Sequence, residues 1–198
     1  MKHLIKVAPL AFALVSHFVT TAAPAATGNN SVLVIQGYQL LSRGAVGPAI
    51  DTLSRAVRQV PGDASARRYL ACALLQKGLA AEAVTQLKAV LLIEPGQASD
   101  LVMLGDACFY AGKLNDAVAA YKEALRVDPS CGQALAGLAQ TCFNMGNLGR
   151  AAEICRQGLA LTSDSQARQK LTALAGKISA RNSVALSTAD HQRDGGAR

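Results

Sequence analysis

Histidine is the side chain that most often does acid–base chemistry near neutral pH, and its placement here argues against an enzyme. The chain has three histidines, His3, His17 and His191, and all of them lie near its two ends. The long segment between His17 and His191 therefore lacks the base that activates a serine or cysteine nucleophile, and it lacks the commonest partner of cysteine at zinc. We expect no catalytic residue, no metal site and no cofactor.

The remaining candidates for chemistry are cysteines and acids. The cysteines are Cys72, Cys108, Cys131, Cys142 and Cys155, and their spacing contains no C-x-x-C motif, so thioredoxin-like redox chemistry is unsupported. Their number is odd, and a count alone does not decide between disulfides and free thiols. The acids are spread along the chain. A carboxylate pair assembled by folding is the enzymatic alternative that stays open, and nothing in the sequence points to its substrate.

The first 25 residues have the three-part pattern of a secretory signal. Lys2 and Lys6 precede an apolar stretch over residues 7–19, and small residues follow, including Ala-Pro-Ala at 23–25. The apolar stretch is shorter than the roughly 20 residues that span a bilayer, which disfavours an uncleaved membrane anchor. We expect cleavage after Ala25 and a periplasmic protein. If the segment is not exported, a cytoplasmic regulator is the alternative.

Composition favours a helical protein. Apolar residues make up 51% of the 198, tryptophan is absent, and alanine and leucine are abundant. The formal net charge of +7 is spread over alternating acids and bases without a dense Lys/Arg block. This pattern is typical of a solvated surface, and we expect no nucleic-acid partner.

A shift of 34 residues brings four sets of residues into register. They are Gly44, Gly78, Gly112 and Gly146; Ala49, Ala83, Ala117 and Ala151; Pro61, Pro95 and Pro129; and Gln36, Leu70, Leu104 and Leu138. Glycine suits a turn with left-handed backbone angles, alanine lets two helices approach closely, and proline ends the second helix. Apolar residues between these marks recur at helical spacing. The pattern predicts repeated helix–turn–helix units.

With this period and these marks, the chain resembles the tetratricopeptide repeat family, whose pattern runs W-x2-L-G-x2-Y and then alanine, an aromatic residue, alanine and proline. The third unit matches it best, through Leu101, Leu104-Gly105, Ala117, Tyr121, Ala124 and Pro129. The fourth unit departs most, with Cys155 at the aromatic position, Gly158 for alanine and Ser163 for proline.

The resemblance implies an all-α fold, an α-solenoid of about four helix–turn–helix repeats within residues 26–163. The expected repeats cover about 30–63, 64–97, 98–131 and 132–163. A capping helix is expected at 164–181, because Leu171, Leu174, Ala175 and Ile178 share one face and would cover the last repeat. Residues 182–198 offer little to bury and are expected to be disordered.

The resemblance also places the cysteines. Cys108 and Cys142 occupy the tyrosine position of neighbouring first helices, where equivalent points lie about 8–10 Å apart, too far for a disulfide. Cys155 takes another core position, while Cys72 falls near the inner face and Cys131 near a junction of repeats. Free buried thiols are therefore expected, with a disulfide as the alternative.

In this family the first helix of each repeat lines a concave groove that holds a peptide or a helix. The resemblance places five aromatic residues there: Tyr38, Tyr69, Phe109, Tyr110 and Phe143. The other positions of the predicted groove hold Val34, Leu41, Arg68, Leu75, Val102, Asp106, Gln140 and Asn144. Such an apolar floor with a few polar points suits an amphipathic helix or an extended apolar segment. The alternative is that several of the rings only pack between neighbouring helices.

Some family members clamp a peptide's terminal carboxylate with basic and asparagine side chains on the first helices. The corresponding places here hold Val34, Tyr38 and Tyr69. The resemblance therefore favours an apolar partner segment.

The leading hypothesis is a scaffold or chaperone-like adaptor of the bacterial envelope that binds a partner protein in this groove, peripheral to the membrane at most. Similar small exported repeat proteins suggest assembly of a pilus, a secretion system, an outer-membrane machine or a polysaccharide exporter. The alternative is a structural accessory subunit that bridges proteins or self-associates through its convex face or capping helix.

Overall fold

The computed structural model describes residues 29–194, with side-chain burial given for 30–183, and these residues form nine helices and no strand. The predicted signal peptide, residues 1–25, lies outside the described residues, as do residues 195–198 of the predicted tail. None of the described helices is both long enough and apolar enough to cross a membrane.

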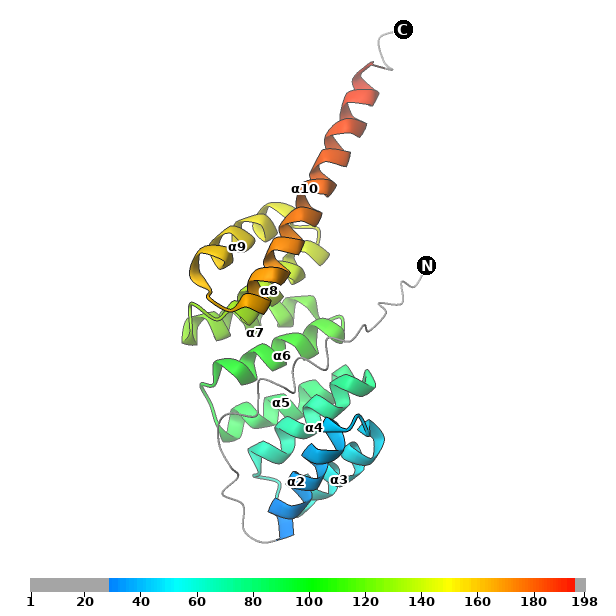
Figure 1. The fold of residues 1–198 in the computed structure, drawn as a ribbon, viewed down its shortest axis with the longest axis vertical. Coiled ribbons are helices and arrows are strands. Elements are labelled where there is room, and N and C mark those ends of the chain that lie inside the picture. Colours follow the sequence, from blue (N-terminus) through cyan, green and yellow to red (C-terminus); the bar gives the residue numbers. More distant parts are fainter. Residues whose placement is uncertain (1–28, 195–198) are drawn as a thin grey trace. The chain divides into compact units, whose positions relative to one another are not determined.

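The helices follow one another as first and second members of pairs (Figure 1). The first helices are α2 (Asn29–Ser42), α4 (Ala64–Lys77), α6 (Ala98–Tyr110) and α8 (Gly132–Asn144). The second helices are α3 (Val46–Gln59), α5 (Ala80–Ile93), α7 (Leu114–Val127) and α9 (Leu148–Leu161), and a long C-terminal helix follows, α10 (Ser165–Asp194).

The chain divides into two compact units. In the described part, the first unit contains α2 to α6 and the second contains α7 to α10. Within the first unit each helix packs on the next one along the chain, and α2 also contacts α4. Within the second unit α8 packs on α7 and α9, and α10 packs on both α8 and α9.

Repeated small residues fix the helix pairs, as the sequence predicts. Gly44, Gly78, Gly112 and Gly146 have φ angles of 75°, 83°, 74° and 79°, which place them in the left-handed region. At Gly78 the first helix closes with a bond from the Leu79 N–H to the Leu74 carbonyl (2.8 Å), a pattern typical of glycine C-caps. The alanines of the 34-residue register, Ala49, Ala83, Ala117 and Ala151, are each 0% exposed, which allows close helix contact.

Helix α10 covers the last repeat with one face and extends further than the sequence predicts. Its residues Ala167, Leu171, Leu174 and Ile178 are buried. The expectation of disorder from residue 182 is wrong for 182–194, because α10 continues to Asp194. The physical reason is that residues 182–194 contain neither proline nor glycine, so no residue there ends the helix.

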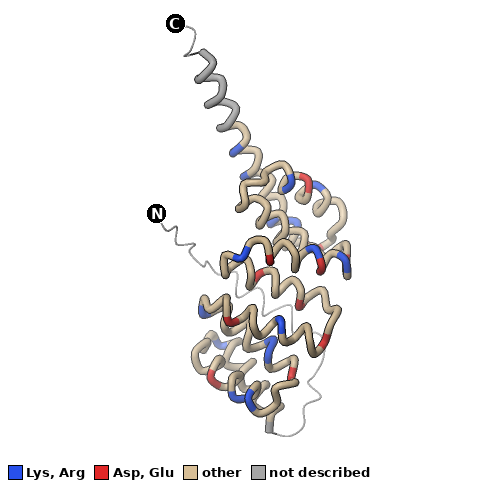
Figure 2. The backbone as a smooth tube through the Cα atoms, turned by 180° about the vertical axis from the view of Figure 1, so that it is seen from behind, with Lys and Arg blue, Asp and Glu red and all other residues tan. Residues whose placement is uncertain are grey.

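Charged residues are interspersed along the helices of each unit (Figure 2). Two ion pairs of the second unit are local, Arg126 with Glu123 and Arg156 with Glu153, each spaced i,i+3 on an exposed helix surface. Pairs of this kind contribute little to stability.

Candidate functional site

Four apolar residues of the predicted groove lie in the core and not on an accessible surface. Val34, Leu41, Leu75 and Val102 are exposed by 1%, 2%, 7% and 3%. Val34, for example, packs in one cluster with Ala56 of α3 and Ala66 of α4. A partner cannot reach side chains that neighbouring helices already cover, so this part of the predicted binding surface is wrong.

Tyr38 and Tyr69 form a half-buried aromatic pair on the neighbouring first helices α2 and α4. Their ring centroids lie 5.3 Å apart with planes tilted by 47°, a favourable geometry for two aromatic rings. Tyr69 also packs against the cluster around Val34. Burial, followed by the influence of Tyr38, raises the pKa of the Tyr69 hydroxyl. The two rings therefore lie between the buried core and the solvent-exposed surface of α2 and α4.

A second aromatic pair lies at the C-terminal end of α6. Phe109 and Tyr110 are 5.6 Å apart between centroids and meet edge to face at 84°. Tyr110 is 38% exposed, and Phe109 is half-buried. Burial and then the nearby carboxylate of Asp106 raise the pKa of the Tyr110 hydroxyl. Asp106 is itself half-buried on the same helix.

Arg68 is not available as the polar contact that the groove prediction assigned to it. Its Nε donates to Asp100 Oδ1 (2.8 Å) and its Nη2 donates to Asp100 Oδ2 (2.8 Å). The same Nη2 also contacts the Glu94 carboxylate. These bonds raise the pKa of the guanidinium, led by the bond to Asp100. Arg68 therefore links α4 to α6, and the repeat pattern of the sequence predicts neither acidic partner.

The predicted groove residues of the second unit form a separate group on α8. Gln140 Nε2 donates to Asn144 Oδ1 (2.8 Å). The half-buried ring of Phe143 lies under the guanidinium of Arg181 on α10, with 5.6 Å from Cζ to the ring centroid. The capping helix therefore covers part of this predicted surface with a cation–π contact.

Four of the five cysteines have thiols with raised pKa values. Cys72, Cys131, Cys142 and Cys155 are free thiols, and Cys108 is buried. Burial raises the pKa of the Cys72 thiol to about 12, and the negative charge of Asp100 adds to the effect. Burial also raises the pKa values of Cys131, Cys142 and Cys155. Because the thiolate is the reactive form, these thiols are poor nucleophiles. Among the described residues no group of three or more His, Cys, Asp or Glu side chains is arranged to hold a metal ion.

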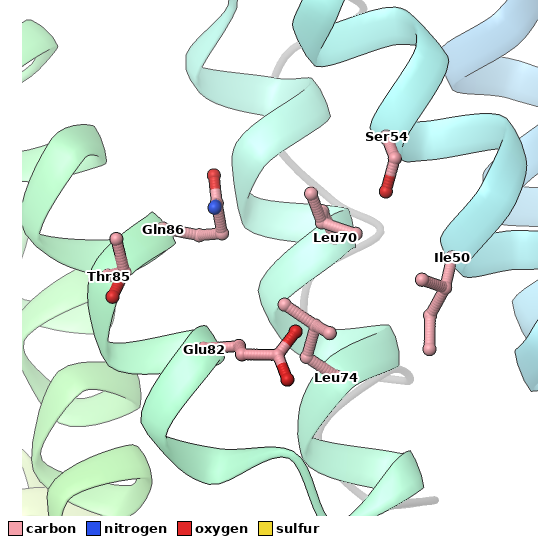
Figure 3. Close-up of a pocket in the computed structure, with 7 residues that line it drawn as sticks. All are labelled: Ile50, Ser54, Leu70, Leu74, Glu82, Thr85 and Gln86. Carbon is pink, nitrogen blue, oxygen red and sulfur yellow. The ribbon is translucent and has the colours of Figure 1, made fainter.

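The first unit contains a cleft between the second helices α3 and α5 that is not among the sites predicted from the sequence (Figure 3). Its volume is about 220 Å³. Leu70 and Leu74 of α4 form its floor, and the walls carry Ile50, Ser54, Glu82, Thr85 and Gln86. Ser54 and Glu82 look like ordinary solvated helix residues in the sequence. The repeat register supplies the missing signal, because it places Ser54 and Glu82 on neighbouring second helices.

The sequence and the fold are both similar to those of known proteins. A model of the tetratricopeptide repeat matches residues 36–99 and 102–167, which together exceed half of the chain. No curated protein matches the sequence.

Solved structures share the fold at low sequence identity. MamA from Desulfovibrio magneticus RS-1 superposes with a TM-score of 0.65 at 21% identity, covering 67% of this chain and 75% of that one. A second MamA crystal structure gives a TM-score of 0.62 at 18% identity, covering 80% and 96%. TTC0263, a thermophilic repeat protein from Thermus thermophilus, gives 0.62 at 23% identity, covering 75% and 82%. These likenesses confirm the predicted fold class.

Both the family match and the fold agree with the helix pairs, the turn glycines and the buried alanines described above. The chain therefore belongs to the tetratricopeptide repeat family, and its fold supports a role as a protein–protein interaction scaffold.

Proposed function

We propose that this protein is an exported scaffold or chaperone-like adaptor of the bacterial envelope that holds a segment of a partner protein on the first helices of its first unit. The surface in question, here called the aromatic face, consists of Tyr38, Tyr69, Phe109 and Tyr110. The observation that carries the proposal is that these rings remain half-buried or exposed on three successive first helices, α2, α4 and α6.

Large rings left accessible in this way suit recognition of an apolar segment. Each ring offers a wide contact area and loses little side-chain entropy on binding, since it has only two rotatable bonds. The three tyrosines add hydroxyl groups that can bond to the backbone or polar side chains of a partner. An amphipathic helix or an extended apolar segment therefore fits the aromatic face better than a charged peptide end.

Three features support a partner smaller than the whole predicted groove. Val34, Leu41, Leu75 and Val102 are buried, Arg68 is bound to Asp100, and Phe143 is covered by Arg181. The proposed contact is accordingly confined to the aromatic face of the first unit.

The proposal of export rests on the pattern of residues 1–25. The role proposed for the exported protein is the assembly of an envelope machine. N-terminal sequencing of the protein recovered from the periplasmic fraction tests the export step. The expected first residue is Ala26. An intact Met1 on cytoplasmic protein would refute it and favour an intracellular adaptor.

The binding surface is tested by affinity capture from an envelope extract followed by mass spectrometry. The test variant is Tyr38→Ala with Tyr110→Ala, because Tyr69 also supports the core. Leu92→Ala is the matched control, since Leu92 is an exposed apolar residue of α5, 86% exposed and outside the aromatic face. The proposal expects a protein that the wild type and the control retain and the double variant loses, with helicity unchanged. Equal capture by all three would move the search to the second helices and α10.

A further inference from the structure

Helix α2 is the first of the described helices, and its composition is that of an interior helix. None of its 14 residues is Asp, Glu, Lys or Arg. Among the described helices this holds for one other, α8, which packs on α7, α9 and α10. Helix α2 packs on α3 and also contacts α4, and both of these follow it in the chain. A helix without charges is suited to burial on all sides, yet no described helix precedes α2 to complete its cover.

The outer stripe of α2 consists of Val32, Ile35, Gln36 and Gln39, here called the α2 face. Their spacing of i, i+3, i+4 and i+7 places them along one side of the helix. Val32 is 51% exposed and Ile35 is 48% exposed, and both glutamines are exposed. The α2 face is therefore uncharged, half apolar and accessible in the single chain.

The repeat register shows how such a stripe is covered elsewhere in the first unit. Val32 and Gln39 correspond to Ala66 and Ala73 of α4, which lie 34 residues later. Ala66 and Ala73 are both 0% exposed, and α4 packs on the second helix that precedes it, α3. The α2 face therefore occupies a position where one helix of the repeat pattern contacts another.

The last described helix supplies a contrast within the same chain. The end helices of repeat arrays generally carry a polar outer face, which keeps the array soluble. Helix α10 agrees with this rule, because Lys170, Lys177 and Arg181 are exposed along it. Helix α2 carries Val32 and Ile35 instead. An exposed apolar stripe at an array end favours an interface over a solvated surface.

The mature chain has no segment of its own that can cover the α2 face. If the signal is cleaved after Ala25, a step that rests on the proposed function, only residues 26–28 precede α2. Three extended residues span about 10 Å, whereas a helix of 14 residues is about 21 Å long. The cover must therefore come from another chain.

We propose that the α2 face pairs with the same face of a second copy of this chain, with the two α2 helices antiparallel about a two-fold axis. The midpoint of α2 lies between Ile35 and Gln36. Ile35 of one copy therefore lies beside Ile35 of the other, and Val32 of each copy lies near Gln39 of the other.

The chemistry of the α2 face suits pairing with itself. Because it carries no charge, no like charges are brought together when two identical faces meet. The amide of Gln36 has both donors and an acceptor, so it can bond to the same amide across the axis. Val32 and Ile35 then leave water together with their copies, which supplies the driving force.

The test is sedimentation velocity of the mature protein over a series of concentrations. One pair of short helices makes a small interface, so the expected result is a monomer–dimer equilibrium. Ile35→Lys places two positive charges side by side at the axis and should weaken the dimer about tenfold or more. Leu92→Lys adds the same charge at a residue of α5 that is 86% exposed, and this matched control should dimerise as the wild type does. Circular dichroism should show unchanged helicity for both variants.

A mixture of two variants tests the symmetry of the pair. Ile35→Glu alone should weaken the dimer as Ile35→Lys does. An equal mixture of the two variants should form dimers again, because opposite charges then meet at the axis. A contact between α2 and a different surface of the second copy would give no such recovery.

A wild type that stays monomeric, an Ile35→Lys variant that dimerises like the wild type, or a mixture without recovery would overturn the proposal. A monomeric wild type that captures an envelope protein, with capture lost in Ile35→Lys and kept in Leu92→Lys, would assign the α2 face to a partner helix instead. The first residue is sequenced on the same sample, and the Ile35 variants leave Tyr69, Phe109 and Tyr110 unchanged. Failure of export or of partner capture is therefore distinguished from failure of the dimer.

Discussion

Arg68 on α4 and Asp100 on α6 form a bidentate ion pair, with both N–O distances at 2.8 Å. The Asp100 side chain is 0% exposed and the Arg68 side chain 13% exposed. Helix α5 separates these two helices in the chain, so the pair ties one first helix directly to the next. It thereby fixes the spacing of the helices that carry Tyr69 and Phe109.

Removing Arg68 should destabilise the first unit strongly. Arg68→Ala leaves the Asp100 carboxylate buried without its cation, which for comparable pairs costs about 3–5 kcal/mol. The measurement is the free energy of unfolding from urea denaturation followed by far-ultraviolet circular dichroism. Glu94→Gln is the control, because Glu94 is 51% exposed and should cost about 1 kcal/mol or less. Similar losses of unfolding free energy for both variants would show that the Arg68–Asp100 pair stabilises the protein no more than an exposed ion pair does.

The second prediction concerns stability and follows from the close packing around Gly137. A Cβ placed on Gly137 of α8 would lie 2.5 Å from Cε1 and Cζ of the buried Tyr121 ring on α7. Gly137→Ala should therefore lower the free energy of unfolding of the second unit by about 1–3 kcal/mol, because the ring has to move within a packed core. The same change at Gly176 meets no atom within 4 Å.

Gly176→Ala is the matched control and should raise stability by about 0.5–1 kcal/mol, since alanine favours the helix interior of α10. Thermal unfolding of the two variants beside the wild type distinguishes the effects. A loss of stability in both would mean that backbone freedom, and not the Tyr121 contact, decides the outcome at Gly137.

Burial of the Cys72 thiol predicts a loss of folding stability at alkaline pH. Its pKa rises from an ordinary value of 9.0 to about 12 on folding, chiefly through burial. Below pH 9 the thiol is protonated in both states and its contribution to stability is complete. Between pH 9 and 12 the unfolded chain ionises while the folded chain holds the proton, so stability falls by up to about 1.4 kcal/mol for each pH unit.

The check is urea denaturation across this alkaline range for the wild type and Cys72→Ala. The wild type should lose stability more steeply, whatever the offset between the two proteins at neutral pH. Parallel slopes would contradict a buried, protonated Cys72. At pH 8 alkylation of Cys72 by iodoacetamide should proceed only after unfolding, because the native thiolate population is very small.

Features that constrain the backbone could be predicted from the sequence. Gly78 is required for its left-handed φ angle, and Ala83 is required because its small side chain lets two helices approach closely. Both residues recur through the chain at the 34-residue period. Such requirements hold wherever the repeat occurs. The helix pairs followed from them without knowledge of any side-chain contact.

Features that depend on which side chains meet could not be predicted. The pairing of Arg68 with Asp100 joins residues 32 positions apart and depends on the rotamers of both. The family pattern gives the face on which Val34 lies but not how deeply Ala56 and Ala66 cover it. The repeat register places Ser54 and Glu82 on neighbouring second helices, but the size of the cleft between α3 and α5 depends on how their side chains pack, which the register does not give.

The two parts of α10 should contribute unequally to stability. Leu171 is 0% exposed and lies against Gly158 of α9, where an added Cβ would fall 2.6 Å from Leu171 Cδ1. Leu171→Ala should lower the free energy of unfolding of the second unit by about 2–5 kcal/mol. A chain shortened to end at Arg181 keeps every buried residue of α10 given above, and it keeps the contact with Phe143.

This shortened chain should therefore unfold at the same urea concentration as the wild type. Its circular dichroism should nevertheless show less total helix, because residues 182–194 are helical in the intact chain. A lower unfolding midpoint would mean that residues 182–198 support the fold through contacts of their own. An unchanged helical signal would instead favour the disordered tail that the composition of these residues predicts.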